Sequence, residues 1–268
     1  MIRMNIIVLI KEVPDMEVVR FDRERGVIDR SSAGAQINPF DLYALQAAVD
    51  LKEKVGGHIW AITMGPEGSI ASLKDAWARG ADECICITDS KFGGADTYAT
   101  SKALSAVIAK MEVDLILCGE KTVDGDTAQV GAGVAELLGI PHSYYVEEIT
   151  NIEDGWVTII TSELCGHRQV RKMKLPALIS VGRKLASPLL PSLKRKIDSI
   201  DIEVKKVRFD ELSDAVTEEE VGLKGSPTKV SKIVIPKEMR RDSRIYREDM
   251  EGFVRAVTKC LSTHQEKK

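Results

Sequence analysis

The chain has 268 residues, of which 44% are hydrophobic and 29% are charged, and its formal net charge is −3. This length and composition exclude a disordered chain and suit one large domain with an appended arm, while the near-balanced charge argues against a general nucleic-acid surface. The first apolar run, residues 6–10, is too short for a signal sequence or a membrane span, so we expect a cytoplasmic protein that contacts no membrane.

Short apolar strands alternate with amphipathic helices through the first half of the chain. This alternation predicts an α/β fold, with a Rossmann-like parallel sheet covered by helices on both faces. Ligands of such sheets bind at the carboxyl ends of the strands, where we expect a nucleotide. The predicted strands span 5–10, 58–64, 83–88 and 114–118, and the predicted helices lie near 39–55, 67–79, 97–111 and 127–138.

The helix ends and one insertion are also marked in the sequence. Asn38 is expected to cap the first helix, with Pro39 in its first turn, and Asp96 to cap the third. Gly80 should end the second helix. Residues 12–37 are predicted to form a hairpin that rims the carboxyl edge of the sheet.

The most informative segment is the loop at 119–131, between a buried strand and a helix start. The first N–H groups of such a helix hold an anion without a basic side chain. Asp124 and Asp126 would repel a phosphate, so we expect Asp126 to cap the helix and Asp124 to bind a ribose hydroxyl or close an Asx turn. A capped loop without a ligand remains an alternative, because Gly and Asp are common in turns.

After residue 141 the pattern changes to alternating segments. Residues 156–162 and 169–174 are predicted to form an antiparallel extension, 177–181 a further core strand, and 187–196 a protruding loop. Residues 198–236 are charged and rich in turns. We therefore divide the chain into a nucleotide-binding domain, 1–198, and a C-terminal extension, 199–268.

The C-terminal extension is expected to end in a helix over 245–261. One stripe of this helix is apolar, so it needs a partner, either its own domain or another subunit. The stripe comprises Ile245, Met250, Phe253, Val254, Val257 and Leu261.

The five cysteines and four histidines show no metal-ligand spacing. Cys84 and Cys86 alternate along a predicted strand and should both face the core as small hydrophobic residues. We expect reduced thiols, no metal site and no catalytic triad.

Three segments together resemble the β subunit of electron transfer flavoproteins: 10–15 (IKEVPD), 38–41 (NPFD) and 124–131 (DGDTAQVG), with 64–66 (MGP) in support. The resemblance runs in order over residues 1–200 and implies an adenine nucleotide alpha hydrolase-like domain. It places phosphate on the backbone of 128–130 and the nucleotide between apolar walls. The implied contacts are Leu9, Asn38, Pro39, Phe40, Asp41, Met64, Gly119, Glu120, Lys121, Thr122, Val123, Asp124, Gly125, Asp126, Thr127, Ala128, Gln129 and Val130.

Within that family, residues 11–15, 94–101 and 124–127 resemble the electron-bifurcating branch. This resemblance implies a β subunit that binds FAD, pairs with an α subunit and takes electrons from NADH (NAD as a transient reactant). The electrons then pass to ferredoxin and to a flavin dehydrogenase of the acyl-CoA or hydroxyacid type. Asp96, Thr97, Thr100 and Ser101 would meet the flavin pyrophosphate or the nicotinamide nucleotide, or would only begin a capped helix. Because the flavin supplies the chemistry, we expect no catalytic residue.

The segment near 184–197 resembles the family's recognition loop, with Leu190 as its anchor for a dehydrogenase. It departs from the family pattern because Pro188-Leu189 replaces the usual Pro-Arg pair. The partner's identity is therefore open.

Two other functions remain open. The chain is a non-bifurcating β subunit with a structural AMP, or a Mg-ATP-binding enzyme or regulator in which Asp124 and Asp126 hold Mg²⁺. In the sequence, Lys121 is the one cation expected near the phosphates for the latter.

Overall fold

A computed structural model of the chain describes residues 3–15, 20–22, 27–29, 34–162, 166–230 and 245–265. Its contacts divide the chain into two compact units, residues 1–232 and 233–268. Each unit is described by itself.

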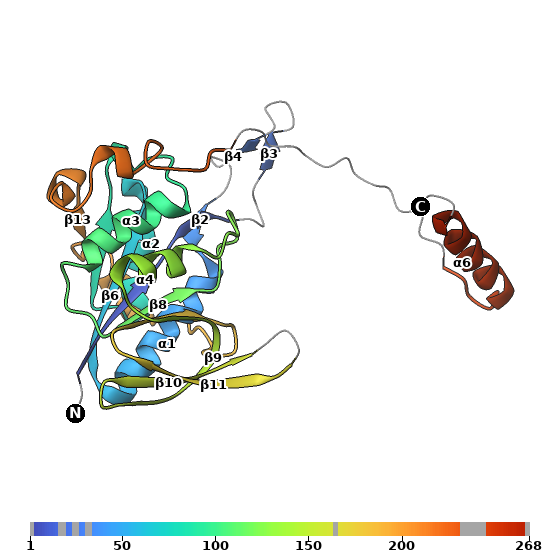
Figure 1. Cartoon of the computed structure of the whole chain (residues 1–268), viewed down its shortest axis with the longest axis horizontal. Helices are drawn as coiled ribbons and strands as arrows, with labels where there is room; N and C mark the ends of the chain where they lie inside the picture. Colours follow the sequence, from blue (N-terminus) through green and yellow to red (C-terminus); the bar gives the residue numbers. More distant parts are fainter. Residues whose placement is uncertain are drawn as a thin grey trace. The chain divides into compact units, whose positions relative to one another are not determined.

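The described residues of the first unit form a nine-stranded sheet in the order β11-β10-β9-β12-β8-β1-β6-β7-β13 (Figure 1). All neighbours from β9 to β13 pair in parallel, and β10 and β11 add an antiparallel extension, as the sequence predicts. The strands are β1 (Met4–Leu9), β6 (Gly57–Met64), β7 (Glu83–Ile87), β8 (Leu115–Gly119), β9 (His142–Glu153), β10 (Trp156–Ser162), β11 (Arg168–Lys174), β12 (Ala177–Val181) and β13 (Lys205–Val207).

Helices cover both faces of the parallel part. Ile6 and Val8 of β1 pack with α1 (Pro39–Val55) and α2 (Ile70–Arg79), whereas Ile7 and Leu9 pack with α3 (Thr97–Ile108) and α4 (Val130–Leu138). Successive side chains of a strand point to opposite faces, so a strand buried on both faces is apolar throughout. Figure 1 shows α3 and α4 side by side on the sheet, where they are in contact.

The sheet has a topological switch point between β1 and β8. The chain goes from β1 to β6 and β7 on one side, then crosses to β8 and β12 on the other. The loops that leave β1 and β8 therefore diverge to opposite faces, and this is where open α/β sheets bind ligands.

Several predicted boundaries need correction. A 3₁₀ turn, η2 (Glu67–Ser69), precedes α2, and α4 begins at Val130 rather than at residue 127. Ala128 has a φ of 53°, which a right-handed helix cannot include, so the N-cap position is Gln129 and the prediction that Asp126 caps this helix is wrong. Asp96 does cap α3, and Gly80 does end α2.

The insertion after β1 is confirmed as paired strands. β2 (Glu12–Pro14) pairs with β5 (Ala35–Ile37), and β3 (Arg20–Asp22) pairs with β4 (Val27–Asp29), both antiparallel. Residues 16–19, 23–26 and 30–33 of the predicted hairpin lie outside the described part of the chain.

The second half contains elements that the sequence did not indicate. β9 is twelve residues long, and the predicted loop at 187–196 runs into a short helix, α5 (Leu193–Asp198). β13 pairs with β7, so the first part of the expected extension joins the sheet. Two 3₁₀ turns follow, η4 (Phe209–Leu212) and η5 (Glu218–Glu220).

The second unit contains α6 (Met250–Gln265), which begins five residues later than predicted. The apolar side chains predicted for its stripe are exposed. No helix of the described residues is both long and apolar enough to span a membrane. The expected partner of the stripe, either the chain's own domain or another subunit, stays a prediction.

Candidate functional site

The carboxylate of Asp41 connects the two diverging loops. Asp41 lies in the first turn of α1 and is 5% exposed. Its Oδ2 accepts the backbone N–H of Lys11 (2.8 Å), after β1, and its Oδ1 accepts that of Gly119 (3.2 Å), at the end of β8. Burial raises the pKa of Asp41 to about 7, although these N–H donors and the Asn38 side chain act to lower it. One buried carboxyl thus fixes the start of both loops.

Gly119 is required by this close approach. A Cβ at Gly119 would lie 2.4 Å from Oδ1 of Asp41 and 2.7 Å from the carbonyl carbon of Phe40. Any side chain would push α1 away from the end of β8.

Asn38 fastens the middle of the loop after β8. It is fully buried, its Nδ2 donates to the carbonyl of Lys121 (2.8 Å), and its Oδ1 accepts the N–H of Val123 (3.2 Å). Asn38 does occupy the predicted N-cap position of α1, but its side chain makes no capping bond and its amide bonds to the loop instead. The sequence could not show this, because the partner lies more than 80 positions away.

Lysine side chains neutralise the two acidic residues of the loop. Lys11 Nζ lies 2.7 Å from Asp124 Oδ2, and Lys121 Nζ lies 3.0 Å from Asp126 Oδ1. Burial raises the pKa of Asp124, but the Lys11 ammonium and further hydrogen bonds outweigh it and leave that pKa below its usual value. The sequence indicated Lys121 as the one cation in this region, but the structure brings Lys11 to the same loop.

These ion pairs also bear on the Mg²⁺ alternative. Each carboxylate that was expected to hold the ion already bonds to an ammonium group. Among the described residues, no three His, Cys, Asp or Glu side chains are grouped to hold a metal.

The loop ends in a backbone arrangement suited to an anion. Ala128 has a φ of 53°, whereas the next residue, Gln129, has a φ of −115° and a ψ of −22°. Such alternation turns successive N–H groups toward one point, and the first N–H groups of α4 add the positive end of its dipole. Tyr144 Oη accepts the N–H of Ala132 (3.1 Å), within that first turn.

The N-terminus of α3 lies beside that of α4. Thr97 Oγ1 donates to Oε1 of Gln129 (3.4 Å), and Ser101 is buried with its hydroxyl on the carbonyl of Thr97 (2.7 Å). A Cβ at Gly133 would lie 2.5 Å from Ser101 Oγ, so this glycine permits the close contact of the two helices. Two helix N-termini therefore point to the same edge of the sheet.

The Asp96 carboxylate is engaged by its own chain. Oδ1 accepts the N–H groups of Tyr98 (3.0 Å) and Ala99 (3.1 Å), while Oδ2 accepts the N–H (2.9 Å) and hydroxyl (2.7 Å) of Thr228. Its predicted contact with a cofactor remains a prediction, and the observed role is structural.

A cationic and aromatic group lies at the start of α1. The guanidinium carbon of Arg183, just after β12, lies 4.8 Å from the ring centroid of the buried Phe40, and Lys121 Nζ lies 5.7 Å from the same centroid. Arg183 was not predicted as a site residue. Its position two residues after the carboxyl end of a core strand is the signal that could have identified it.

The structure gathers the predicted contacts at one edge, with one exception. Leu9 and Met64 end neighbouring parallel strands, Leu9 being buried and Met64 half-buried. Pro39 and Phe40 begin α1, and residues 119–130 form the loop that Asn38 and Asp41 hold. Thr100 lies on α3 near Thr97. Leu190 belongs to a different surface, on the segment that leads into α5.

Comparison with known proteins gives a consistent result. The family model described as "Electron transfer flavoprotein domain" matches residues 25–211. The chain is 44% identical over 228 residues to the electron transfer flavoprotein subunit beta of Thermoanaerobacterium thermosaccharolyticum, covering 85% of this chain and 86% of the relative. It is 39% identical over 240 residues to protein FixA of Azotobacter vinelandii, covering 87% and 85%.

A third relative is named as part of a complex. The caffeyl-CoA reductase-Etf complex subunit CarD of Acetobacterium woodii is 36% identical over 235 residues, covering 87% of this chain and 88% of the relative.

Proposed function

Because this chain belongs to the electron transfer flavoprotein family as a β subunit, we propose that it binds FAD at the carboxyl ends of β1, β6 and β8. With an α subunit, in the cytoplasm, it takes electrons from NADH and passes them to ferredoxin and to a flavin dehydrogenase. The bound flavin supplies the redox chemistry, and the chain supplies binding and position.

The observation that carries the proposal is the fixed loop at the switch point. Asn38, Asp41 and Lys11 hold residues 119–124 by hydrogen bonds, which leaves the backbone of 128–130 at the start of α4 to face an anion. Leu9 and Met64 lie at the ends of adjacent strands, where the half-buried Met64 would offer apolar surface to an adenine and the buried Leu9 supports it from the core. The nucleotide phosphate would lie on the N–H groups of 128–130 without a dedicated basic side chain.

A second helix N-terminus favours a dinucleotide over AMP. AMP carries one phosphate, which the start of α4 alone can hold, whereas FAD carries a pyrophosphate. The start of α3 lies next to that of α4 through Thr97 and Gln129. Because the Asp96 carboxylate already accepts the N–H groups of Tyr98 and Ala99, the hydroxyl of Thr97 is the group that α3 would offer to a second phosphate. A structural AMP is the alternative for this site.

The nucleotide content of the native αβ complex tests this proposal. We expect acid denaturation followed by chromatography to release two FAD per αβ pair and no AMP. One FAD with one AMP would leave an electron-transfer subunit without an NADH-reactive flavin. Addition of NADH to the anaerobic complex should also bleach the flavin absorbance.

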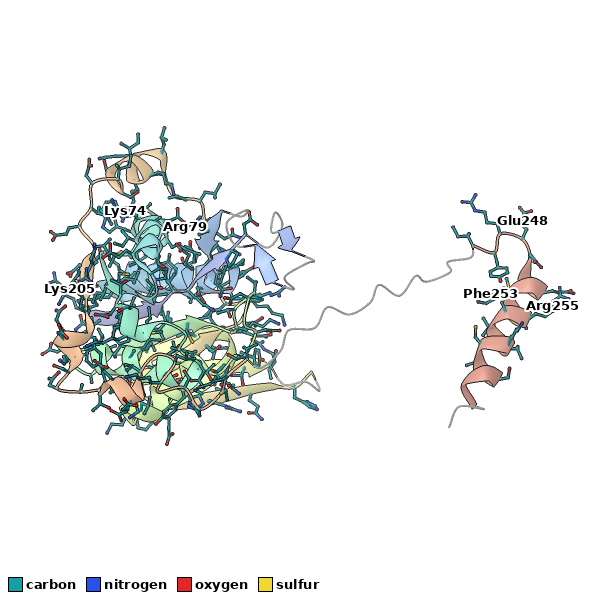
Figure 2. The ribbon with its side chains drawn as sticks, turned by 90° about the horizontal axis from the view of Figure 1, so that it is seen from above. Lys74, Arg79, Lys205, Glu248, Phe253 and Arg255 are labelled. Atoms are coloured by element: carbon teal, nitrogen blue, oxygen red, sulfur yellow. The ribbon has the colours of Figure 1, made fainter. Side chains whose placement is uncertain are left out.

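Leu190 is proposed as the contact for the dehydrogenase, and the C-terminal extension as a contact for another subunit. Leu190 is 87% exposed, and the apolar side chains of α6 are exposed as well. Phe253 and Arg255 mark this helix in Figure 2. Removal of residues 233–268 should shift the complex to smaller species on a sizing column.

A further inference from the structure

The backbone of Leu189 is held by side chains from two different helices. Oε1 of Gln46, on α1, accepts its N–H (3.0 Å), and Nη1 of Arg79, at the end of α2, donates to its carbonyl (3.0 Å). Both polar backbone groups of the residue that precedes Leu190 are therefore fixed, although the side chains of both leucines are exposed.

Each of these two side chains is oriented by a carboxylate one helical turn away. Gln46 Nε2 donates to Asp50 Oδ1 (2.8 Å), which turns Oε1 toward the loop, and Gln46 is only 9% exposed. Arg79 Nε donates to Asp75 Oδ2 (2.7 Å). Burial raises the pKa of Asp75, but Arg79 and Lys196 outweigh it and lower that pKa, so the carboxylate stays ionised.

The following helix is attached to α2 as well. Arg195 stacks on Trp77, with its guanidinium carbon 4.5 Å from the ring centroid, and donates to the carbonyl of Ala81 (3.3 Å). Lys196 pairs with Asp75, and Lys74 donates to the carbonyl of Ile200. Figure 2 labels Lys74 and Arg79, both on α2.

This attachment keeps an apolar surface exposed. Leu189, Leu190, Leu193, Ile197 and Ile200 are all more than half exposed. Burying these apolar side chains within the chain would stabilise the fold. The hydrogen bonds and ion pairs described above hold the backbone but leave the side chains exposed. A fixed backbone under exposed apolar side chains instead reduces the conformational entropy that a partner must remove on binding.

We propose that Gln46 and Arg79 are positioning residues that hold Leu190 in its docking conformation for the flavin dehydrogenase. This inference rests on the proposed role of Leu190 as the dehydrogenase contact. The two side chains do not touch the partner but act through the backbone of Leu189.

The test compares variants of the αβ complex with the flavin dehydrogenase that co-purifies with it. Gln46→Met and Arg79→Met keep most of the side-chain volume but remove the acceptor and the donor. We expect each to raise the KM for the dehydrogenase about tenfold, as the loss of one such bond implies, while kcat stays within about twofold. Arg79→Lys, which retains a donor, should recover part of the affinity.

Other measurements separate positioning from general damage. Amide exchange at Leu189 and Leu190 should accelerate in both methionine variants, whereas flavin content should match the wild type and the melting temperature should fall by about 2–4 °C at most. Arg168→Met, which removes an exposed arginine paired with Glu148 on β9, is the matched control and should change none of these.

The variant Leu190→Ala separates failure of the positioning role from failure of the docking role. If Leu190→Ala raises the KM but Gln46→Met and Arg79→Met do not, the positioning role is refuted and the docking role stands. If Leu190→Ala leaves the KM unchanged, the docking role fails and the positioning role fails with it.

Discussion

At the residue scale, the candidate site depends on polar side chains that the protein buries. Asn38 is fully buried and Asp41 is 5% exposed, yet each accepts backbone N–H groups of the loops that leave the sheet. A buried acceptor stabilises a structure when its donors are in place and costs free energy when they are removed. Asn38 and Asp41 therefore fix the conformation of the loop more strongly than solvent-exposed side chains would.

Asp41 gives a prediction with a defined pH dependence. Its pKa in the folded chain, about 7, lies above the ordinary 3.8, so the folded chain retains a proton that the unfolded chain releases. This contribution to the free energy of unfolding is fully present below pH 4 and is lost as the pH rises through 7, by about 4 kcal/mol at most.

Asp41→Asn removes this titration. The amide also turns an N–H group toward one of the two backbone donors, so we expect the variant to lose about 1–3 kcal/mol of stability at pH 5. Urea unfolding of both chains at pH 5, 6, 7 and 8 checks this. The difference between them should shrink as the pH rises, and a constant difference would contradict the assigned role.

At the scale of elements, the start of α3 is tied to the last described residues of the first unit. Asp96 Oδ2 holds Thr228, and the N–H of Asp96 donates to Ser226 Oγ (2.8 Å). Burial raises the pKa of Asp96, but the hydroxyl of Thr228 and the N–H of Ala99 outweigh it and keep that pKa below the usual value. Ser226 and Thr228 are therefore held at a helix N-terminus of the candidate site.

Thr228→Val tests this attachment, because it removes the hydroxyl donor and keeps the shape. We expect a loss of about 1 kcal/mol in the free energy of unfolding and faster amide exchange at Tyr98 and Ala99, whose N–H groups share the same carboxylate. Thr228→Ser retains the hydroxyl and should behave as the wild type. Equal stability of the valine and serine variants would show that the hydroxyl contributes nothing.

The elements that could be predicted are those with a regular apolar pattern and local end signals. β1, β6, β7, β8 and the helices between them belong to this group, because their periodicity and capping residues lie within the element. The start of α4 could not be predicted, since the positive φ at Ala128 is a property of the folded loop and not of alanine.

Other elements depend on distant partners. β13 is a three-residue strand that exists because β7 offers it an edge, and α5 is held by side chains of α2. The candidate site likewise combines a part that the local sequence indicates with a part that depends on distant residues. The loop at 119–131 was identified from its glycines, but the bonds from Asn38, Asp41 and Lys11 join positions far apart in the sequence.

At the scale of the whole molecule, the fold places one site where a parallel sheet divides. The strand order puts the ends of β1 and β8 next to each other while their following segments go to opposite faces. The segment proposed for docking, around Leu189 and Leu190, belongs to other elements and is held by side chains of α1 and α2. The proposed nucleotide site and the proposed docking surface therefore lie on separate elements of one chain.

The most direct test of the central claim is the nucleotide content of the Gly119→Ala complex beside that of Gly68→Ala. An added Cβ meets Asp41 Oδ1 at 2.4 Å in the first variant and nothing within 4 Å in the second. The clash should cost about 1–3 kcal/mol and disturb the loop. We predict that folded Gly119→Ala complex keeps only the FAD of its α subunit, whereas Gly68→Ala keeps both. Full nucleotide content in folded Gly119→Ala would contradict a site at this edge.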